Sequence, residues 1–427
     1  MHVRLERLRP CDAVLVAAAL SALLVYSGAA PVCRKGGFYS AVPQDSVRRL
    51  EGRLVSSPVR RSGGCYSAVF APECAGGVIG GAELRSAAGG TLRVSLLASD
   101  VEAHYPGRLF TEHGSSSMSA GALYESGGRF ALEGRLWADR GGTPVFHADN
   151  AEFLGFGGRV QDSIAAFRAR ARLHFKRLMY RWGSAGGLVL ALLSGSREYL
   201  SPELAAAFRL AGLSHLLALS GMHLSCFGSA ARRFGAAAQL SVAVAFVWFA
   251  GASPSLFRAL LCALLGMAAR MLFVRSVRQV NVLAVSFLIH LFAFPQDVRS
   301  AAFILSYTSS LGIALAGGRL LRIAVRFLPR SLAMPVATSL AAQIFAAPVS
   351  LAFFGAMSPV ALFACVVVSP LIALFMKSGL VAVLLCLMFP AMCVPLGFVM
   401  GAQYALIDSL VSLFAAAPQI VLWRSGG

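Results

Sequence analysis

The chain has 427 residues, of which 57% are hydrophobic and only 13% are charged, and its mean hydropathy is +0.70. A soluble protein of this length carries about 25% charged residues, so the composition excludes an ordinary soluble protein and indicates an integral membrane protein. The length leaves room for one soluble domain beside a multi-span core. The formal net charge of +19 is typical of a protein with basic cytoplasmic loops. It would also produce a positive electrostatic potential that favours binding of a polyanion such as DNA.

The N-terminal segment is basic and then apolar. Three arginines within the first ten residues precede an almost wholly apolar run over residues 11–30, which is about long enough to cross a bilayer. A cleaved signal peptide is the alternative, but the apolar run is longer than the apolar region of a usual signal peptide. We therefore expect residues 1–30 to form an uncleaved transmembrane anchor, with the chain from residue 31 outside the cytoplasm.

Residues 31–160 are richer in Gly, Ser, Arg and acids, and their apolar runs are short. Residues 129–139 and 143–153 alternate in polarity around a Gly-containing turn, which predicts a β-hairpin. Five or so short strands in this length predict a small exterior β-barrel of the oligonucleotide-binding (OB-like) type. The other strands are expected at 47–56, 65–71 and 91–98.

Residues 161–182 are typical of a basic amphipathic helix that lies on a membrane surface. Two other interpretations stay open: a helix that packs the exterior domain onto the core, and a helix that contacts nucleic-acid phosphates. The apolar residues recur at spacings of three and four: Ile164, Phe167, Ala171, Phe175, Leu178 and Trp182.

Residues 183–427 are mostly hydrophobic and carry 15 Lys and Arg against four acids. The basic groups, Lys377 and Arg424 among them, fall at alternate ends of successive apolar runs, which predicts cytoplasmic N- and C-termini and an exterior position for residues 31–181. The role of the short segment 186–195 stays open. With the anchor, we expect a polytopic α-helical membrane protein of about ten spans, the others being 204–228, 236–252, 254–273, 279–296, 300–318, 332–354, 357–376, 378–400 and 403–423.

Nine cysteines are present, and most lie in apolar runs, where a small buried hydrophobe is the usual role. Cys65 and Cys74 flank a short segment of the exterior domain and can form a disulfide in an oxidising compartment; two free thiols are the alternative. The sequence holds no CxxC, no HExxH and no acid-rich cluster. We therefore expect no metal and no cofactor.

The most polar stretch of the apolar region reads HLLALSGMH over residues 215–223. Polar side chains within a membrane segment are costly, so they usually face a protein interior or a water-filled path. Gly221 permits a close backbone approach or a break in the helix. The stretch therefore indicates transport or intramembrane chemistry rather than a passive anchor.

This stretch resembles the signature of the ComEC family, the inner-membrane DNA-uptake channels of bacterial competence. That signature pairs a Gly-(Asp/Ser)-Arg element with a following run, which here are residues 195–197 and residues 211–223 (AGLSHLLALSGMH). The family often has Asp where Ser196 stands. Further similarity begins at 253–267, where Arg258 fits the family's Pro…Arg-Ala helix, and continues more weakly to about residue 375.

The resemblance implies transport of single-stranded DNA across the bacterial inner (plasma) membrane during natural transformation, and not an enzyme. It implies contact with membrane lipid and, as partners, a competence DNA receptor and a cytoplasmic ATPase or helicase; a homo-oligomer is left open. Many members also carry a metallo-β-lactamase-like domain, but its His/Asp motif does not occur here, so we expect no built-in nuclease. The expected path-lining residues are His215, Ser220, Gly221, His223 and Arg258, with Arg197 and Arg209 at the outer mouth.

Two other functions stay open. A small-molecule or ion transporter would depend on a carboxylate that can couple protons, such as Asp297 or Asp408, although Asp408 can also pair with an arginine. An intramembrane serine hydrolase would use Ser220 and His223, but a spacing of three residues on one helix gives poor attack geometry. Arg258 can instead snorkel to the membrane surface.

Overall fold

The structure is a computed structural model, and it describes residues 10–27, 37–60, 65–79, 82–97, 101, 124–138, 144–197, 199–251, 253–271, 278–418 and 420–421. The chain divides into two compact units. The β unit comprises residues 34–191 and 196–199, and the helical unit comprises residues 1–33, 192–195 and 200–427.

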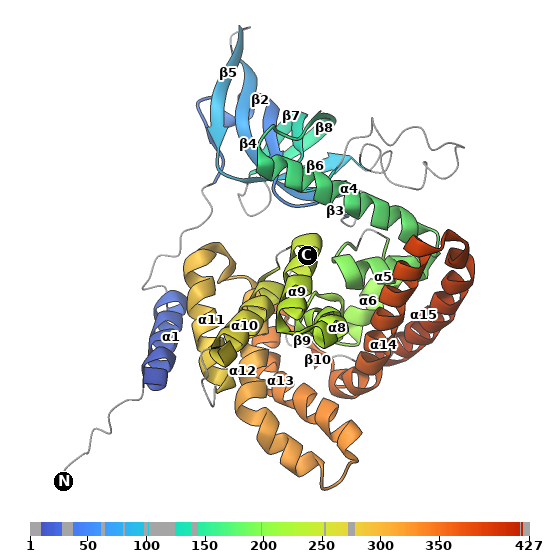
Figure 1. Ribbon diagram of the computed structural model, residues 1–427. Coiled ribbons are helices and arrows are strands. Elements are labelled where there is room, and N and C mark those ends of the chain that lie inside the picture. The colour runs from blue at the N-terminus through green and yellow to red at the C-terminus, as the bar shows by residue number, and fades with distance from the viewer. Residues whose placement is uncertain are drawn as a thin grey trace, which may run out of the picture. The chain divides into compact units, whose positions relative to one another are not determined.

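The β unit is built on one eight-stranded sheet (Figure 1). Buried residues alternate with more exposed ones along most of β2 and along β6, because successive side chains of a strand point to opposite faces. Leu50, Phe70, Phe130 and Phe146 are fully buried on the inner face. The strands are β1 (Tyr39–Ser40), β2 (Val47–Leu54), β3 (Val59–Arg60), β4 (Cys65–Ile79), β5 (Ala82–Gly89), β6 (Leu92–Leu97), β7 (Arg129–Ala138) and β8 (Pro144–Gly155).

The predicted hairpin is confirmed, since β7 and β8 pair antiparallel from Arg129↔Gly155 to Ala138↔Pro144. The predicted small five-stranded barrel is not confirmed. The strand order is β1-β5-β4-β2-β7-β8-β6, with a further pairing of β6 to β4. Strand β4 is 15 residues long and pairs with β2, β3, β5 and β6, so the sheet extends through β5 and β1 beyond the strands that the sequence indicated.

Of the two alternatives for Cys65 and Cys74, the structure has the free thiols and not the disulfide. Both thiols are free, and both residues lie on strand β4, nine positions apart. A strand rises about 3.3 Å per residue, whereas a disulfide needs Cα atoms within about 7 Å. Cys65 instead stands opposite Leu97 on β6, and Cys74 opposite Ala87 on β5.

Two helices follow the sheet, α4 (Val160–Tyr180) and α5 (Gly183–Ser194). Helix α4 coincides with the predicted amphipathic element, but the side chains that it buries are not all the expected ones. Arg172 and Lys176 are buried, whereas Ile164 and Phe167 of the apolar set are exposed. The second half of α4 therefore packs within the β unit, and whether the helix also lies on a membrane surface or on the core stays a prediction.

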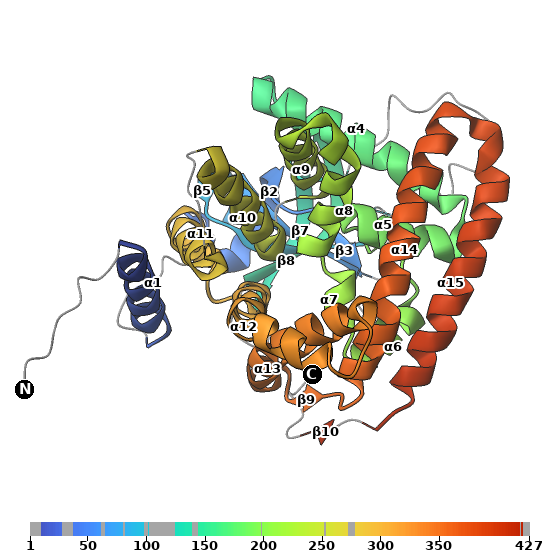
Figure 2. The same ribbon diagram turned by 60° about the horizontal axis from the view of Figure 1, so that its bottom comes forward.

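The helical unit contains α1 and the chain from α6 onward (Figure 2). Helix α12 packs against α13, α14 against α15, and α8 against α9. Helix α1 packs against α11, and the Tyr26 hydroxyl donates a hydrogen bond to the Val298 carbonyl (2.8 Å). The helices are α1 (Pro10–Tyr26), α6 (Pro202–Leu210), α7 (Ser214–Leu217), α8 (Gly221–Ala231), α9 (Ala236–Ala250), α10 (Pro254–Met271), α11 (Gln279–Ala293), α12 (Ala301–Ala324), α13 (Arg330–Phe354), α14 (Ala361–Met388) and α15 (Cys393–Ala415).

Within the described residues, five helical segments are long and apolar enough to cross a membrane. They are Pro254–Met271, Ala301–Ala324, Ala333–Phe354, Ala361–Met388 and Pro390–Ala415. Helices α9 and α11 have 15 residues each, short of the roughly 20 that a span needs. The chain is thus a polytopic membrane protein, but the predicted count of about ten spans is not confirmed.

Two regions depart from the predicted spans. The segment 204–228 is not one helix but the three short helices α6, α7 and α8, because the backbone leaves the helical conformation at Gly212 and Ala218. The predicted boundary at Lys377 is also wrong, since this residue lies inside α14. The interruption comes instead at Pro390, which begins a short 3₁₀ turn, so the alternation of basic groups that predicted a cytoplasmic C-terminus does not hold there.

Candidate functional site

The signature run, residues 211–223, begins at the end of α6. The N–H of Leu213 donates to the Phe208 carbonyl (2.7 Å) and the N–H of Gly212 to the Arg209 carbonyl (3.1 Å). This is a Schellman ending, which places a glycine in the left-handed conformation just after the helix, and Gly212 has φ +73°. A Cβ at Gly212 would lie 2.6 Å from the Cβ of Ala361 on α14, so glycine also permits the close approach of these two segments.

The second break lies between α7 and α8, where Ser220 and His223 cap the start of α8. The N–H of Ser220 donates to Nδ1 of His223 (3.1 Å), and the Ser220 carbonyl accepts from the N–H of His223 (3.1 Å). The third residue of the helix thus reaches back to the capping residue, as Glu does in a capping box. The polar pair that the sequence singled out therefore starts a helix inside an apolar unit.

The same pair has the wrong arrangement for a serine nucleophile and its base. The Ser220 hydroxyl lies 3.1 Å from His223 Nδ1, but that nitrogen already accepts the backbone N–H. The His223 side chain is fully buried, and its Nε2 has no hydrogen-bond partner among the described residues. A base must be oriented by a third group and reached by substrate, and His223 meets neither condition.

Arg258 of α10 lies beside the start of α8. Its Nη1 donates to the Ser306 carbonyl of α12 (2.6 Å), and its Nη2 would lie 3.9 Å from a Cβ at Gly221. The side chain therefore points into the helical unit and does not snorkel. Among the residues that the structure describes, Arg258 makes no ion pair with a carboxylate, so a half-buried cation stands next to the signature run.

The remaining predicted site residues are more scattered. His215 on α7 is exposed, and its Nε2 lies 3.6 Å from Sγ of Cys365 on α14. Arg209 is exposed at the end of α6 in the helical unit, and Arg197 is exposed in the β unit. The structure thus brings Ser220, Gly221, His223 and Arg258 together and places His215 beside a different helix.

The two carboxylates named for a transporter differ in their surroundings. Asp297 Oδ2 lies 3.8 Å from Nε2 of His290, which is buried, and His290 Nδ1 lies 3.3 Å from the Tyr307 hydroxyl. Asp408 on α15 is half-buried and makes no ion pair within the described ranges. The expected pairing of Asp408 with an arginine is therefore not found among them.

A buried ionic cluster in the β unit joins helix α4 to the sheet. Glu125, which precedes β7, receives Nζ of Lys176 at 2.5 Å and Nε of Arg172 at 3.1 Å, and it accepts from the Ser57 hydroxyl (2.5 Å). Arg172 Nη2 also donates to the Ser196 hydroxyl (2.6 Å). The Gly-Ser-Arg element is thus attached through Ser196 to a buried guanidinium of α4.

The two cations set the protonation of Glu125. Burial opposes its ionisation, but Lys176 and Arg172 outweigh this effect and lower the pKa of the carboxyl from 4.5 to about 2. Because an opposite charge within a few ångströms favours the ionised form, the cluster is charged at neutral pH. It therefore contributes stability that depends on the carboxylate being ionised.

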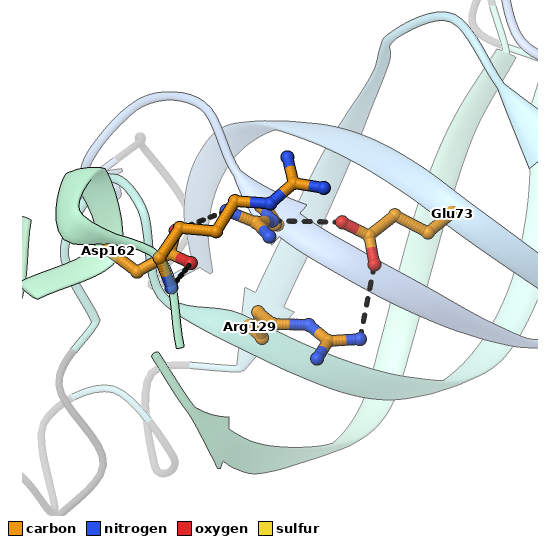
Figure 3. Close-up of polar contacts among 5 residues, drawn as sticks. Glu73, Arg129 and Asp162 are labelled. Atoms are coloured by element: carbon orange, nitrogen blue, oxygen red, sulfur yellow. Dashed lines mark hydrogen bonds and ion pairs between the residues drawn. The ribbon is translucent and has the colours of Figure 1, made fainter. Parts of the chain in front are cut away.

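A second, more exposed network fixes the start of α4 (Figure 3). Arg53 of β2 donates to Glu73 of β4 (2.9 Å) and to Asp162 of α4 (2.5 Å), and Arg129 of β7 donates to Glu73 (3.1 Å). Asp162 also accepts the N–H of Arg159 (3.1 Å), which caps the helix. Several arginines of the β unit are therefore engaged within the protein.

Sequence reasoning missed the Glu125 cluster. The sequence did contain a signal. Arg172 and Lys176 are four residues apart, so they share one face of a helix. The apolar Phe175 and Met179 lie next to them on the same side of α4. A pair of cations on a partly apolar face is compatible with a buried acid as their partner. The partner could not be identified, because Glu125 lies outside every strand that the sequence indicated.

Comparison with known proteins identifies relatives of the helical unit. The sequence model of the family described as "Competence protein" matches residues 192–425, more than half of the chain. The chain is similar to "ComE operon protein 3" of Bacillus subtilis (strain 168), with 28% identity over 178 residues. That match covers 39% of this chain and 22% of the relative. No solved structure matches the chain.

Replacement of Gly212 should destabilise the helical unit. In Gly212→Ala, the left-handed conformation costs about 1–2 kcal/mol, and the new Cβ clashes with Ala361. We expect a lower thermal midpoint for the purified protein in detergent, with part of the loss restored in the double variant Gly212→Ala/Ala361→Gly. Gly401→Ala is the control, because a Cβ there meets nothing within 4 Å. A Gly212→Ala variant as stable as the wild type would contradict the close approach.

Removal of the Glu125 charge should be far more costly than removal of an exposed one. Glu125→Gln leaves Arg172 and Lys176 buried without this carboxylate, which costs about 3–5 kcal/mol. Glu73→Gln, the matched control, breaks partly exposed pairs and should cost about 1 kcal/mol or less. Thermal unfolding of the purified variants measures both, and equal losses would refute the distinction.

The same carboxyl predicts a pH dependence. Because its pKa is lowered in the folded protein, its stabilising effect is present above about pH 4.5 and is lost as the pH falls towards about 2. The wild-type thermal midpoint should fall across this window, and Glu125→Gln should remove that part of the fall. A variant that follows the wild-type curve throughout would show that other groups control acid unfolding.

Proposed function

Because the chain belongs to the Competence protein family, we propose that it takes part in DNA uptake for transformation and that its helical unit conducts single-stranded DNA across the inner membrane. The observation that carries the proposal is the half-buried guanidinium of Arg258, which is next to the signature run and has no carboxylate partner within the described residues.

A phosphodiester chain needs positive charge and hydrogen-bond donors to cross a slab of low dielectric constant. Transfer of an isolated ion into such a medium is very unfavourable, so charges there are paired or remain hydrated. Arg258 is anchored through Nη1 to the Ser306 carbonyl, which leaves Nη2 directed at Gly221. Because Gly221 has no side chain, this nitrogen is not covered by a neighbouring Cβ and can approach a phosphate.

The site residues then take different roles. Ser220, Gly221 and Arg258 line the path at the start of α8, and His215 lines it at α7. His223 is a positioning residue, since it is buried and holds the Ser220 backbone. Arg197 and Arg209, both exposed, attract the strand at the outer mouth.

In this proposal the β unit, within residues 31–181, lies outside the cytoplasm and guides the strand. Non-specific binders of single strands combine stacking on aromatic rings with cations that follow the phosphates. Arg135 and Trp137 are exposed and are two residues apart on β7, so they share one face of the strand, and Trp137 is 70% exposed. This pair supplies both kinds of contact.

The partners and location follow from the same proposal. The chain lies in the bacterial inner membrane with its basic N-terminus in the cytoplasm. It receives DNA from a competence DNA receptor, and a cytoplasmic ATPase or helicase draws in the strand. A homo-oligomer is compatible with this arrangement, and no nuclease activity is assigned to residues 1–427.

An ion or small-molecule transporter is the second candidate, and the contact between His290 and Asp297 (3.8 Å) favours it. A carboxylate beside a buried histidine and Tyr307 is an arrangement that can pass protons. The two functions differ in their requirements. A proton-coupled transporter needs Asp297, whereas a DNA conduit needs Arg258.

Loss of the Arg258 charge should impair DNA uptake. In Arg258→Gln, we expect nuclease-protected internal label from single-stranded or double-stranded DNA to fall at least about ten-fold, the equivalent of about 1.4 kcal/mol. Arg270→Gln is the matched control, because Arg270 lies on the same helix, α10, and is exposed. It should import as the wild type does.

Two outcomes would overturn the proposal. If deletion of the whole protein leaves internal label unchanged in an otherwise competent strain, the protein does not conduct DNA. If deletion abolishes uptake but Arg258→Gln imports normally, and the variant is present in the membrane at wild-type amounts, the assignment of Arg258 to the path is wrong.

A further inference from the structure

A second polar cluster lies in the helical unit, around Cys365 of α14. Sγ of Cys365 lies 3.6 Å from Nε2 of His215, 3.6 Å from the Ser339 hydroxyl and 3.5 Å from the Ser369 hydroxyl. These side chains come from α7, α13 and α14, all of which belong to the same unit. Helix α14 is the most apolar of the candidate spans, with a mean hydropathy of 2.4, so polar groups that converge here need a reason.

His215 is the basic side chain among the three partners of the Cys365 sulfur. The Ser369 hydroxyl donates its one proton to the Cys365 carbonyl (2.6 Å), so it cannot also donate to the sulfur. A thiol is a weak donor, and a neutral imidazole has one acceptor nitrogen. Nε2 of His215, 3.6 Å from the sulfur, is therefore the basic atom that can take the thiol proton, and the two side chains form a thiol–imidazole pair.

The members of the cluster differ in exposure. Cys365 is 6% exposed, Ser339 and Ser369 are half-buried, and His215 is exposed. Gly212 holds the two sides together, because its backbone packs against Ala361, one turn before Cys365 on α14. An imidazole exposed within an apolar helical unit must meet either lipid or water, and contact with lipid is unfavourable.

We infer that Cys365 and His215 form a thiol-modification site on the wall of the transport path, and that Ser339 and Ser369 extend this wall along α13 and α14. The inference rests on the proposed function, and it adds a second side to the path lined by α8 and α10. The ligands that fit the site are small, water-soluble thiol electrophiles, and a group attached to Cys365 would obstruct the path.

The chemistry requires no component beyond the reagent. With a cationic alkyl methanethiosulfonate, His215 Nε2 takes the thiol proton and the sulfur of Cys365 attacks the alkyl-bearing sulfur of the reagent. A disulfide bond forms, the sulfur–sulfur bond of the reagent breaks, and methanesulfinate leaves with the electron pair. The thiolate is the reactive form of cysteine, so an adjacent base accelerates the step.

The test compares two cysteines of one helix in the same wild-type sample. Cys386 also lies on α14 and is 3% exposed, so it controls for burial. Vesicles that contain the full chain are treated with the cationic reagent, and the modified fraction of each cysteine is followed by peptide mass spectrometry. We expect Cys365 to react at least about ten times faster than Cys386 and to slow several-fold in His215→Gln. Equal rates would overturn the inference.

DNA uptake is measured in parallel, each strain being compared with its own untreated sample. Wild-type cells should lose uptake after treatment, and Cys365→Ala cells should not lose any further uptake. If Cys365 reacts rapidly but treated wild-type cells import normally, the site is not on the path and the inference fails. If deletion of the protein leaves uptake unchanged, the proposed function fails, whereas rapid labelling of Cys365 still shows that the pair borders water.

Discussion

The helical unit depends on how the chain between α6 and α8 satisfies its backbone where it leaves the helix. In an apolar surrounding an unpaired N–H or carbonyl is costly, and this segment breaks twice within about ten residues. Gly212 allows the first break to close through a Schellman ending, and His223 closes the second by accepting the Ser220 N–H. Because these contacts close both breaks, the short helix α7 between them can present His215 to α14, and the start of α8 places Gly221 beside Arg258.

In the β unit, the buried groups that need a partner are charged side chains. Arg172 and Lys176 are buried, and Glu125 makes that burial tolerable because it lies within 3.1 Å of both. The same guanidinium bonds to Ser196 of the Gly-Ser-Arg element. The ComEC family, which this stretch resembles, often has Asp where Ser196 stands. An acidic residue there would therefore meet a cation that is already in place.

The sequence predicted the parts that depend on local pattern and missed those that depend on long-range pairing. Alternation and a Gly-containing turn were sufficient for the hairpin of β7 and β8. The eight-stranded sheet was not predicted, because nothing local shows that β4 pairs with four strands. Hydropathy located the apolar region but divided α14 at Lys377, since an exposed lysine along one side of a long helix resembles a loop residue. At the site, the signature run identified the polar residues, but nothing in the sequence shows that their partners are Cys365 and Ser306, which lie far away in the chain.

The cap at the start of α8 also restricts the chemistry of its imidazole. Nδ1 of His223 faces an N–H group that only donates, so this nitrogen must keep its lone pair and the ring proton must sit on Nε2. A second proton could bind only if the ring turned away and released the Ser220 backbone. Charging of this histidine and the hydrogen bond from the Ser220 N–H are therefore mutually exclusive, so the side-chain cap at the start of α8 requires a neutral ring.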